Sequence, residues 1–156
     1  MSRILLHFFR SCAGVRRLMA LFVIAILAIP ASADTAINAI RVTSRMDLNS
    51  ILLSGIDVVF FYDDSIVSDQ PFTQFDWYSK KREYRETHAE VIDVVNLPIL
   101  QGFDSATLSL PDGYQRALKV LVFAEHQTPQ SAPADVTGMT NVLIEIDQFG
   151  VFVSDK

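Results

Sequence analysis

The chain has 156 residues and a formal net charge of −5, but its charges are unevenly distributed. Residues 34–156 hold all eighteen acidic side chains and nine of the thirteen basic ones, which is a balance of −9. This charge repels phosphates, which argues against nucleic acid and anionic lipid surfaces as partners. The single cysteine, Cys12, precedes these residues, so they contain no disulfide and no thiolate zinc site.

The first 33 residues have the three parts of a secretory signal peptide. Basic side chains (Arg3, Arg10, Arg16 and Arg17) are followed by an apolar run over 18–29, and Ala31 and Ala33 flank Ser32 at the expected cleavage site. The apolar run is shorter than the roughly 20 residues of a spanning helix, so cleavage is favoured over an uncleaved anchor. Acylation of Cys12 is disfavoured, because the apolar run follows this cysteine. We expect residues 34–156 to form one exported domain in the periplasm.

Most of the exported part is expected to form strands. Residues 56–62 and 118–124 are apolar on both faces and predict two buried central strands. Alternating apolar residues over 37–46 and 141–146 predict strands with one wet face, and 151–153 returns after a tight turn. Shorter strands are predicted over 107–110 and within 84–97, where Pro98 limits the strand to an edge or an end. The fold class is therefore all-β, a sandwich with long loops.

The segment over 71–85 predicts a single short helix of one or two turns. Phe72, Phe75, Trp77 and Tyr78 recur at helical spacing, and Pro71 suits a first turn. Aromatic side chains beside the basic run over 80–85 could form a platform for nucleic acid or sugar. Packing of the aromatic residues on the sheet is favoured, because the domain is acidic and the helix must bury one face.

Candidate metal and catalytic residues are sparse. Asp63, Asp64 and Asp69 could hold calcium from a loop, but they lack the EF-hand spacing, and a solvated loop is favoured. His88 and Glu90 would face the same way on a strand, and no third ligand pairs with them or with His126. A hydrolase that uses Asp63, Asp64 or Glu145 has no further support. The sequence predicts neither an enzyme nor a cofactor.

The connection over 47–55 is unusually apolar for a loop. Leu48 and three consecutive aliphatic residues, Ile51, Leu52 and Leu53, lie between two predicted strands. Such a loop either covers the core or contacts a partner.

The order of these elements resembles the TssJ family, the small periplasmic component of the type VI secretion membrane complex, usually an outer-membrane lipoprotein. The matching features are an Asp47-Leu48-Asn49 turn, an apolar strand over 58–62, aromatic residues at 72, 75 and 77, and the stretch over 108–113. The resemblance implies a transthyretin-like sandwich that binds the periplasmic part of a large inner-membrane subunit. It implies contact residues in two loops: Leu48, Asn49, Ile51, Leu52, Leu53, Asp112 and Gly113.

The chain departs from that family because no lipobox cysteine stands at the cleavage site. Membrane association is therefore expected to be indirect or through an uncleaved signal, and association with the outer membrane is left open. The alternative function is an exported carbohydrate- or ligand-binding module, in which Trp77, Tyr78 and Tyr84 form an exposed platform.

Overall fold

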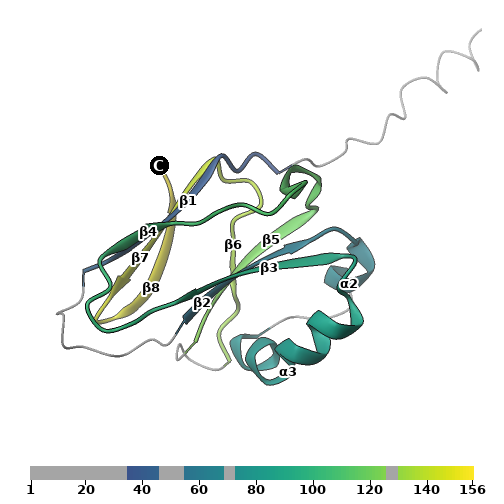
Figure 1. The fold of residues 1–156 in the computed structure, drawn as a ribbon, viewed down its shortest axis with the longest axis horizontal. Helices are drawn as coiled ribbons and strands as arrows, with labels where there is room; N and C mark the ends of the chain where they lie inside the picture. The colour runs from purple at the N-terminus through teal and green to yellow at the C-terminus, as the bar shows by residue number, and fades with distance from the viewer. Residues whose placement is uncertain (1–34, 46–54, 69–72, 126–129) are drawn as a thin grey trace, which may run out of the picture. The chain divides into compact units, whose positions relative to one another are not determined.

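A computed structural model describes residues 35–45, 55–68, 73–125 and 130–156, and the side chain of Val67 is not described. Two four-stranded sheets run in the orders β4-β1-β7-β8, the first sheet, and β3-β2-β5-β6, the second sheet (Figure 1). The predicted β-sandwich class is confirmed. The elements in chain order are β1 (Ala39–Ser44), β2 (Gly55–Phe61), α2 (Asp64–Ser68), α3 (Gln74–Thr87), β3 (Ile92–Pro98), β4 (Ser105–Thr107), the 3₁₀ turn η1 (Tyr114–Arg116), β5 (Lys119–Ala124), β6 (Ala134–Asp135), β7 (Asn141–Asp147) and β8 (Gly150–Asp155).

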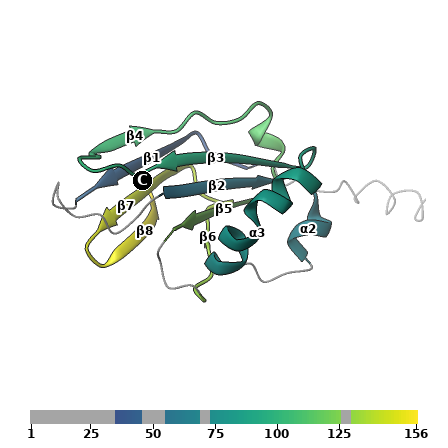
Figure 2. The ribbon, with the colours of Figure 1, turned by 60° about the horizontal axis from the view of Figure 1, so that its bottom comes forward.

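The two strands predicted to be central are neighbours in the second sheet. All seven residues of β2 are buried, as are the last five of β5, and the two strands pair antiparallel. Helix α3 lies along the outer face of this sheet, across β2 and β5 (Figure 2). Both strands are apolar on both faces because one face meets the first sheet and the other meets the helix.

The first sheet has one buried and one open face. β1 pairs parallel with β7, and β7 pairs antiparallel with β8, which places Ile40 and Val42 of β1 beside Val142 and Ile144 of β7. These side chains point inward and are buried, whereas the residues between them are partly or fully exposed. The alternation predicted from the sequence is confirmed. The main core lies between the sheets and includes Ile40, Val42, Ile56, Val58, Phe60, Val120, Val122, Val142, Ile144 and Ile146.

A second, smaller core joins α3 to the second sheet. Trp77 packs against Phe123 with ring centroids 4.9 Å apart, and Val59, Phe61 and Leu121 complete the contact. Beside them lies the buried carboxylate of Asp57, which accepts hydrogen bonds from the side chains of α3 and β3. An aromatic ring and a polar cluster therefore both help to hold helix α3 on the sheet.

The helix is longer than predicted. It has 14 residues rather than one or two turns, and it continues to Thr87, so 84–87 is helical and not the start of a strand. Thr73 is its N-cap: the Thr73 hydroxyl accepts from the backbone N–H of Asp76, and the Asp76 carboxylate accepts from the backbone N–H of Thr73. This capping box starts the helix, and the residues over 80–86 sustain it because they are mostly strong helix formers.

Two predicted loops and one predicted strand also differ from the expectation. The acidic segment predicted as a loop starts α2, where the Asp63 carboxylate accepts from the backbone N–H and hydroxyl of Ser65. The segment over 128–140 contains β6 and the buried Val136, in addition to residues outside the described part. The strand predicted over 107–110 is β4, three residues long and ending at Thr107. Pro98 ends β3, which is an edge strand as predicted.

The predicted signal peptide lies outside the described residues, as does Asp69. Residues 33–156 form one compact unit by themselves. Among the residues the structure describes, no helix is long and apolar enough to cross a membrane.

Capping carboxylates predict how stability changes with pH. Hydrogen bonds from the side chain of Ser65 lower the pKa of Asp63, those from the side chain of Thr73 lower that of Asp76, and those from the Asn141 backbone lower that of Asp155. In the acidic range the unfolded chain therefore binds more protons than the folded chain, so folding becomes less favourable as the pH falls. We expect the urea midpoint to stay constant above pH of about 5 and to fall as the pH drops below about 4, through the folded-state pKa values.

The matched variant is Thr73→Ala, which removes the hydroxyl that lowers the pKa of Asp76. It should start from a lower midpoint at neutral pH and lose less on acidification. An equal loss for both proteins would show that Asp76 does not contribute.

Candidate functional site

The two outer faces of the sandwich differ in their cover. α3 covers the second sheet, whereas no helix of the described residues packs on the outer face of the first. Neighbouring residues on this open face follow the register: Arg41 lies beside Leu143, Thr43 beside Glu145, and Glu145 beside Phe152. The open face is therefore a surface that the fold leaves available to a partner.

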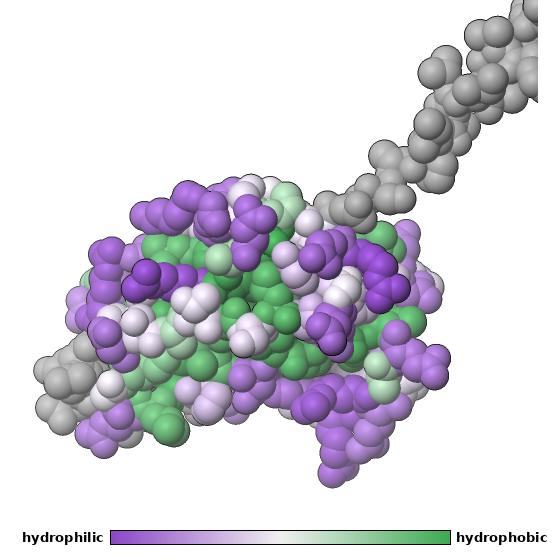
Figure 3. Space-filling model, turned by 45° about the horizontal axis from the view of Figure 1, so that its top comes forward, coloured by the Kyte–Doolittle hydropathy of each residue, from purple (hydrophilic) through white to green (hydrophobic). Residues whose placement is uncertain are grey.

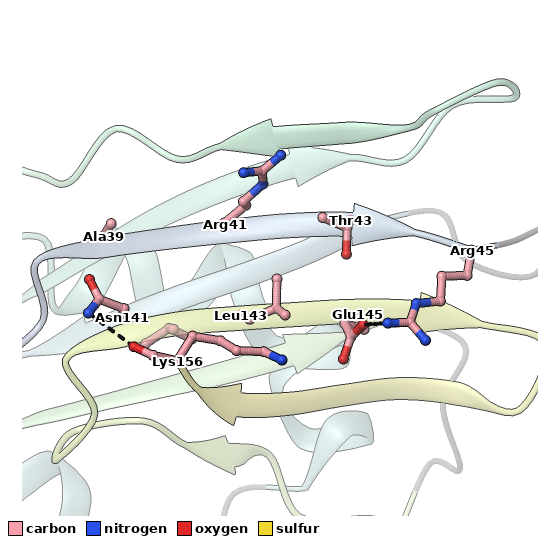
Figure 4. A pocket seen from close by; sticks show the side chains of 9 residues that line it. Ala39, Arg41, Thr43, Arg45, Asn141, Leu143, Glu145 and Lys156 are labelled. Carbon is pink, nitrogen blue, oxygen red and sulfur yellow. Dashed lines mark hydrogen bonds and ion pairs between the residues drawn. The ribbon is translucent and has the colours of Figure 1, made fainter.

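A groove lies on this open face, along β1 and β7 (Figure 4). Its volume is about 560 Å³, within the range of binding pockets. Leu143 lies between Arg41 and Lys156, and the ion pair between Arg45 and Glu145 lies toward one end. We call this the sheet groove; it is lined by Ala39, Arg41, Thr43, Arg45, Asn141, Val142, Leu143, Glu145 and Lys156.

The turn between β7 and β8 presents an exposed aromatic ring. Phe149 is 80% exposed and Phe152, on β8, is 52% exposed. The Asp147 carboxylate accepts hydrogen bonds from the backbone N–H groups of Phe149 (2.7 Å) and Gly150 (3.2 Å). These bonds stabilise the turn that presents Phe149 to solvent. We call Phe149 and its turn the hairpin tip.

A third apolar area lies on the side of the sandwich that carries β4 and η1. Figure 3 shows this side, where apolar surface crosses the middle of the domain between hydrophilic margins. Separately from this view, the connection from β3 to β4 exposes Leu100 (72%), while Ile99 and Phe103 of the same connection pack against the main core.

The two predicted contact loops begin at opposite ends of β1. Asp112 and Gly113 form the predicted turn, with Gly113 at φ +73°. The 3₁₀ turn η1 that follows accepts a hydrogen bond from the backbone N–H of Thr35, which precedes β1. The other loop follows Arg45, whose backbone N–H donates to Ile146 at the far end of β7. Asp112 and Gly113 therefore lie at the opposite end of β1 from where that loop starts. The residues predicted in that loop, Leu48, Asn49, Ile51, Leu52 and Leu53, are outside the described residues, and their role stays a prediction.

Candidate metal ligands do not assemble in the described part of the chain. No group of three or more His, Cys, Asp or Glu side chains there could hold a metal ion. His88 caps the end of α3 with its ring 6.0 Å from that of Tyr84, and Glu90 follows in a turn. The expectation that His88 and Glu90 share one face of a strand is therefore wrong, because β3 begins only at Ile92.

Trp77 cannot serve as an exposed sugar platform. Its side chain is fully buried, and its Nε1 donates to Asp57 at 2.9 Å. Tyr84 stacks on Trp77 at 6.1 Å and is itself half-buried. As predicted, the aromatic side chain packs on the sheet, although Phe75 remains 59% exposed.

The sequence interpretation missed the hairpin tip and the sheet groove. The sequence predicts a tight turn before 151–153 and a strand with one wet face over 37–46, and it singles out neither Phe149 nor Arg41. A signal was available for the first: an aromatic residue within a turn that Asp147 caps has no core to enter. None was available for the groove, because Arg41 and Leu143 become neighbours only through the pairing of β1 and β7.

Comparison with known proteins gives a structural likeness. No protein-family model matches the chain, and no curated protein matches it. Among solved structures, it is similar to Lip of Serratia marcescens, a membrane-bound component of the type VI secretion system, with a TM-score of 0.45 and 12% sequence identity. The likeness covers 76% of this chain and 98% of that one. At this identity, no residue role is transferred from Lip.

Proposed function

We propose that the domain is a non-catalytic subunit of a type VI-like secretion membrane complex that binds the periplasmic part of a large inner-membrane subunit. The resemblance of its sequence to the TssJ family supports this function, with the domain in the periplasm. The observation that carries the proposal is the hairpin tip, because exposed aromatic residues, phenylalanine among them, are enriched at protein interfaces.

The hairpin tip lies at the end of the first sheet where the described part of β1 ends. β1 and β7 are parallel and in register from Ala39 with Asn141 to Ser44 with Ile146. Arg45, the last described residue before the segment over 46–54, therefore lies beside the end of β7, where the hairpin tip begins. The cost of ordering Phe149 on binding is reduced because Asp147 already holds its turn.

A capture experiment tests this function. The tagged protein is mixed with a detergent extract of bacterial envelopes, and the captured proteins are identified by mass spectrometry. We expect a large inner-membrane protein with a periplasmic domain, and we expect Phe149→Ser to reduce its recovery at least about tenfold, the effect of losing an interface anchor. Phe75→Ser is the matched control, because Phe75 is also an exposed phenylalanine but lies on α3.

A second variant tests the predicted loop. Leu52→Asp should weaken capture while the melting temperature stays nearly constant, if this loop contacts the partner. A large decrease in melting temperature would instead assign Leu52 to the core.

Recovery of the domain alone, or equal losses for Phe149→Ser and Phe75→Ser, would contradict the proposed function.

A further inference from the structure

The sheet groove carries a charge opposite to that of the domain. Arg41, Arg45 and Lys156 line it with one carboxylate, Glu145, which is paired with Arg45. Residues 34–156 as a whole have a balance of −9. Arg41 has no ion-pair partner in the described part of the chain, so its guanidinium remains available to an anion. The groove is therefore a local cationic site on an acidic protein.

The shape of the sheet groove favours an extended ligand. Its lining follows β1 from Ala39 to Arg45, six residue steps, which span about 20 Å on a strand. The middle is apolar at Leu143, and Thr43 and Asn141 add polar side chains along its length. Guanidinium and carboxylate groups form forked hydrogen bonds, so Arg41 suits a carboxylate beside an apolar side chain.

We propose that the sheet groove binds an extended, acidic segment of a partner protein, with a carboxylate on Arg41 and an apolar side chain over Leu143. Arg41 and Lys156 are the two cations of the groove outside the Arg45–Glu145 pair, so they match one or two carboxylates of the bound segment. A polyanion such as a nucleic acid would meet the repulsion of the remaining acidic surface. This site is separate from the hairpin tip, and its occupant need not be the partner captured there.

Fluorescence polarisation with short labelled peptides tests the proposal on the purified protein. The probe is an octapeptide in which leucine occupies every second position and aspartate or threonine occupies the others. Its two matched forms carry asparagine or lysine in place of aspartate. We expect the aspartate peptide to bind at least about tenfold more tightly than either matched form, because an aligned charged hydrogen bond contributes about this factor. Binding should weaken between about 50 and about 500 mM NaCl, as expected for exposed charges.

Variants locate the site. Arg41→Glu and Lys156→Glu should each weaken binding about tenfold, because each replaces an attraction with a repulsion. Arg82→Glu is the matched control, since Arg82 is a highly exposed arginine on α3, on the other sheet. Thermal melting should be the same for the three variants within about 2 °C, because surface substitutions change stability little.

Other outcomes overturn the proposal. Failure of the aspartate peptide to bind, equal binding of the asparagine form, or equal losses for Arg41→Glu and Arg82→Glu would each do so. Arg41-dependent binding to phosphatidylglycerol vesicles, without peptide binding, would assign the groove to lipid instead. None of these results depends on capture by the hairpin tip. Phe149→Ser should leave peptide binding unchanged, so this proposal and the proposed function can fail independently.

Discussion

Replacing Asp57 by alanine is expected to lower the free energy of unfolding by about 3 kcal/mol, because it breaks a buried ion pair by removing one partner. The Asp57 carboxylate is fully buried and accepts from Trp77 Nε1 at 2.9 Å and from Asn96 Nδ2 at 2.7 Å. Lys81 Nζ lies 2.8 Å from one of its oxygens and 2.7 Å from the other. The variant leaves all three donors without this acceptor.

The Asp57 cluster joins three elements, so its loss should loosen α3 in particular. Asp57 lies on β2, Asn96 lies on β3, and the other two donors belong to the helix. Urea unfolding followed by circular dichroism measures the loss. Asp104→Ala removes an exposed carboxylate and should change the free energy of unfolding by no more than about 0.5 kcal/mol. Equal effects of the two variants would show that the cluster does not hold the helix.

The central strands were predictable because their burial is recorded locally. Each residue of β2 is buried, and an apolar run without alternation indicates that both faces of a strand are covered. The alternation over 141–146 likewise identified the inward residues Val142, Ile144 and Ile146. In both cases a side chain reports the environment of its own face, so no knowledge of strand pairing is needed.

The extent of α3 was not predictable from apolar periodicity. Of its fourteen residues, only Gln74 and Trp77 are buried, so the helix has almost no apolar stripe. It depends instead on its capping box, its helix-forming residues and the Asp57 cluster. The Thr73-x-x-Asp76 spacing was a usable signal for the start of the helix. Asp57 was a second signal, because a single carboxylate within a buried strand requires partners.

The candidate sites depend on pairings that a sequence does not state. Arg41 and Leu143 are about a hundred positions apart, and only the parallel register of β1 and β7 makes them neighbours. The sequence of a strand also does not show which of its two faces a helix packs against. The covered face of the second sheet and the open face of the first are products of tertiary packing.

This division of the faces connects stability to function. The Asp57 cluster and the small core fix α3 to the second sheet, so the helix cannot compete with a ligand for the first. The hairpin tip and the sheet groove both belong to the first sheet. Variants that weaken α3 should therefore reduce stability and leave the affinity of the remaining folded protein unchanged.

Replacing Trp77 by alanine is expected to lower the free energy of unfolding by about 4 kcal/mol, because a fully buried aromatic ring is lost and a cavity remains. The ring stacks on Phe123 and Tyr84, and its Nε1 donates to Asp57. Trp77→Phe should cost less, since it keeps a ring against Phe123 and loses the donor. Urea unfolding followed by circular dichroism measures both variants.

Combining Trp77→Ala with Asp57→Ala tests whether the two residues act together. Residues in contact usually show a coupling energy, so the double variant should lose less than the two single variants together, by at least about 1 kcal/mol. The expected reason is that either change alone already releases much of α3 from the second sheet. Strict additivity would contradict this reason and show that ring packing and the Asp57 cluster stabilise the helix independently.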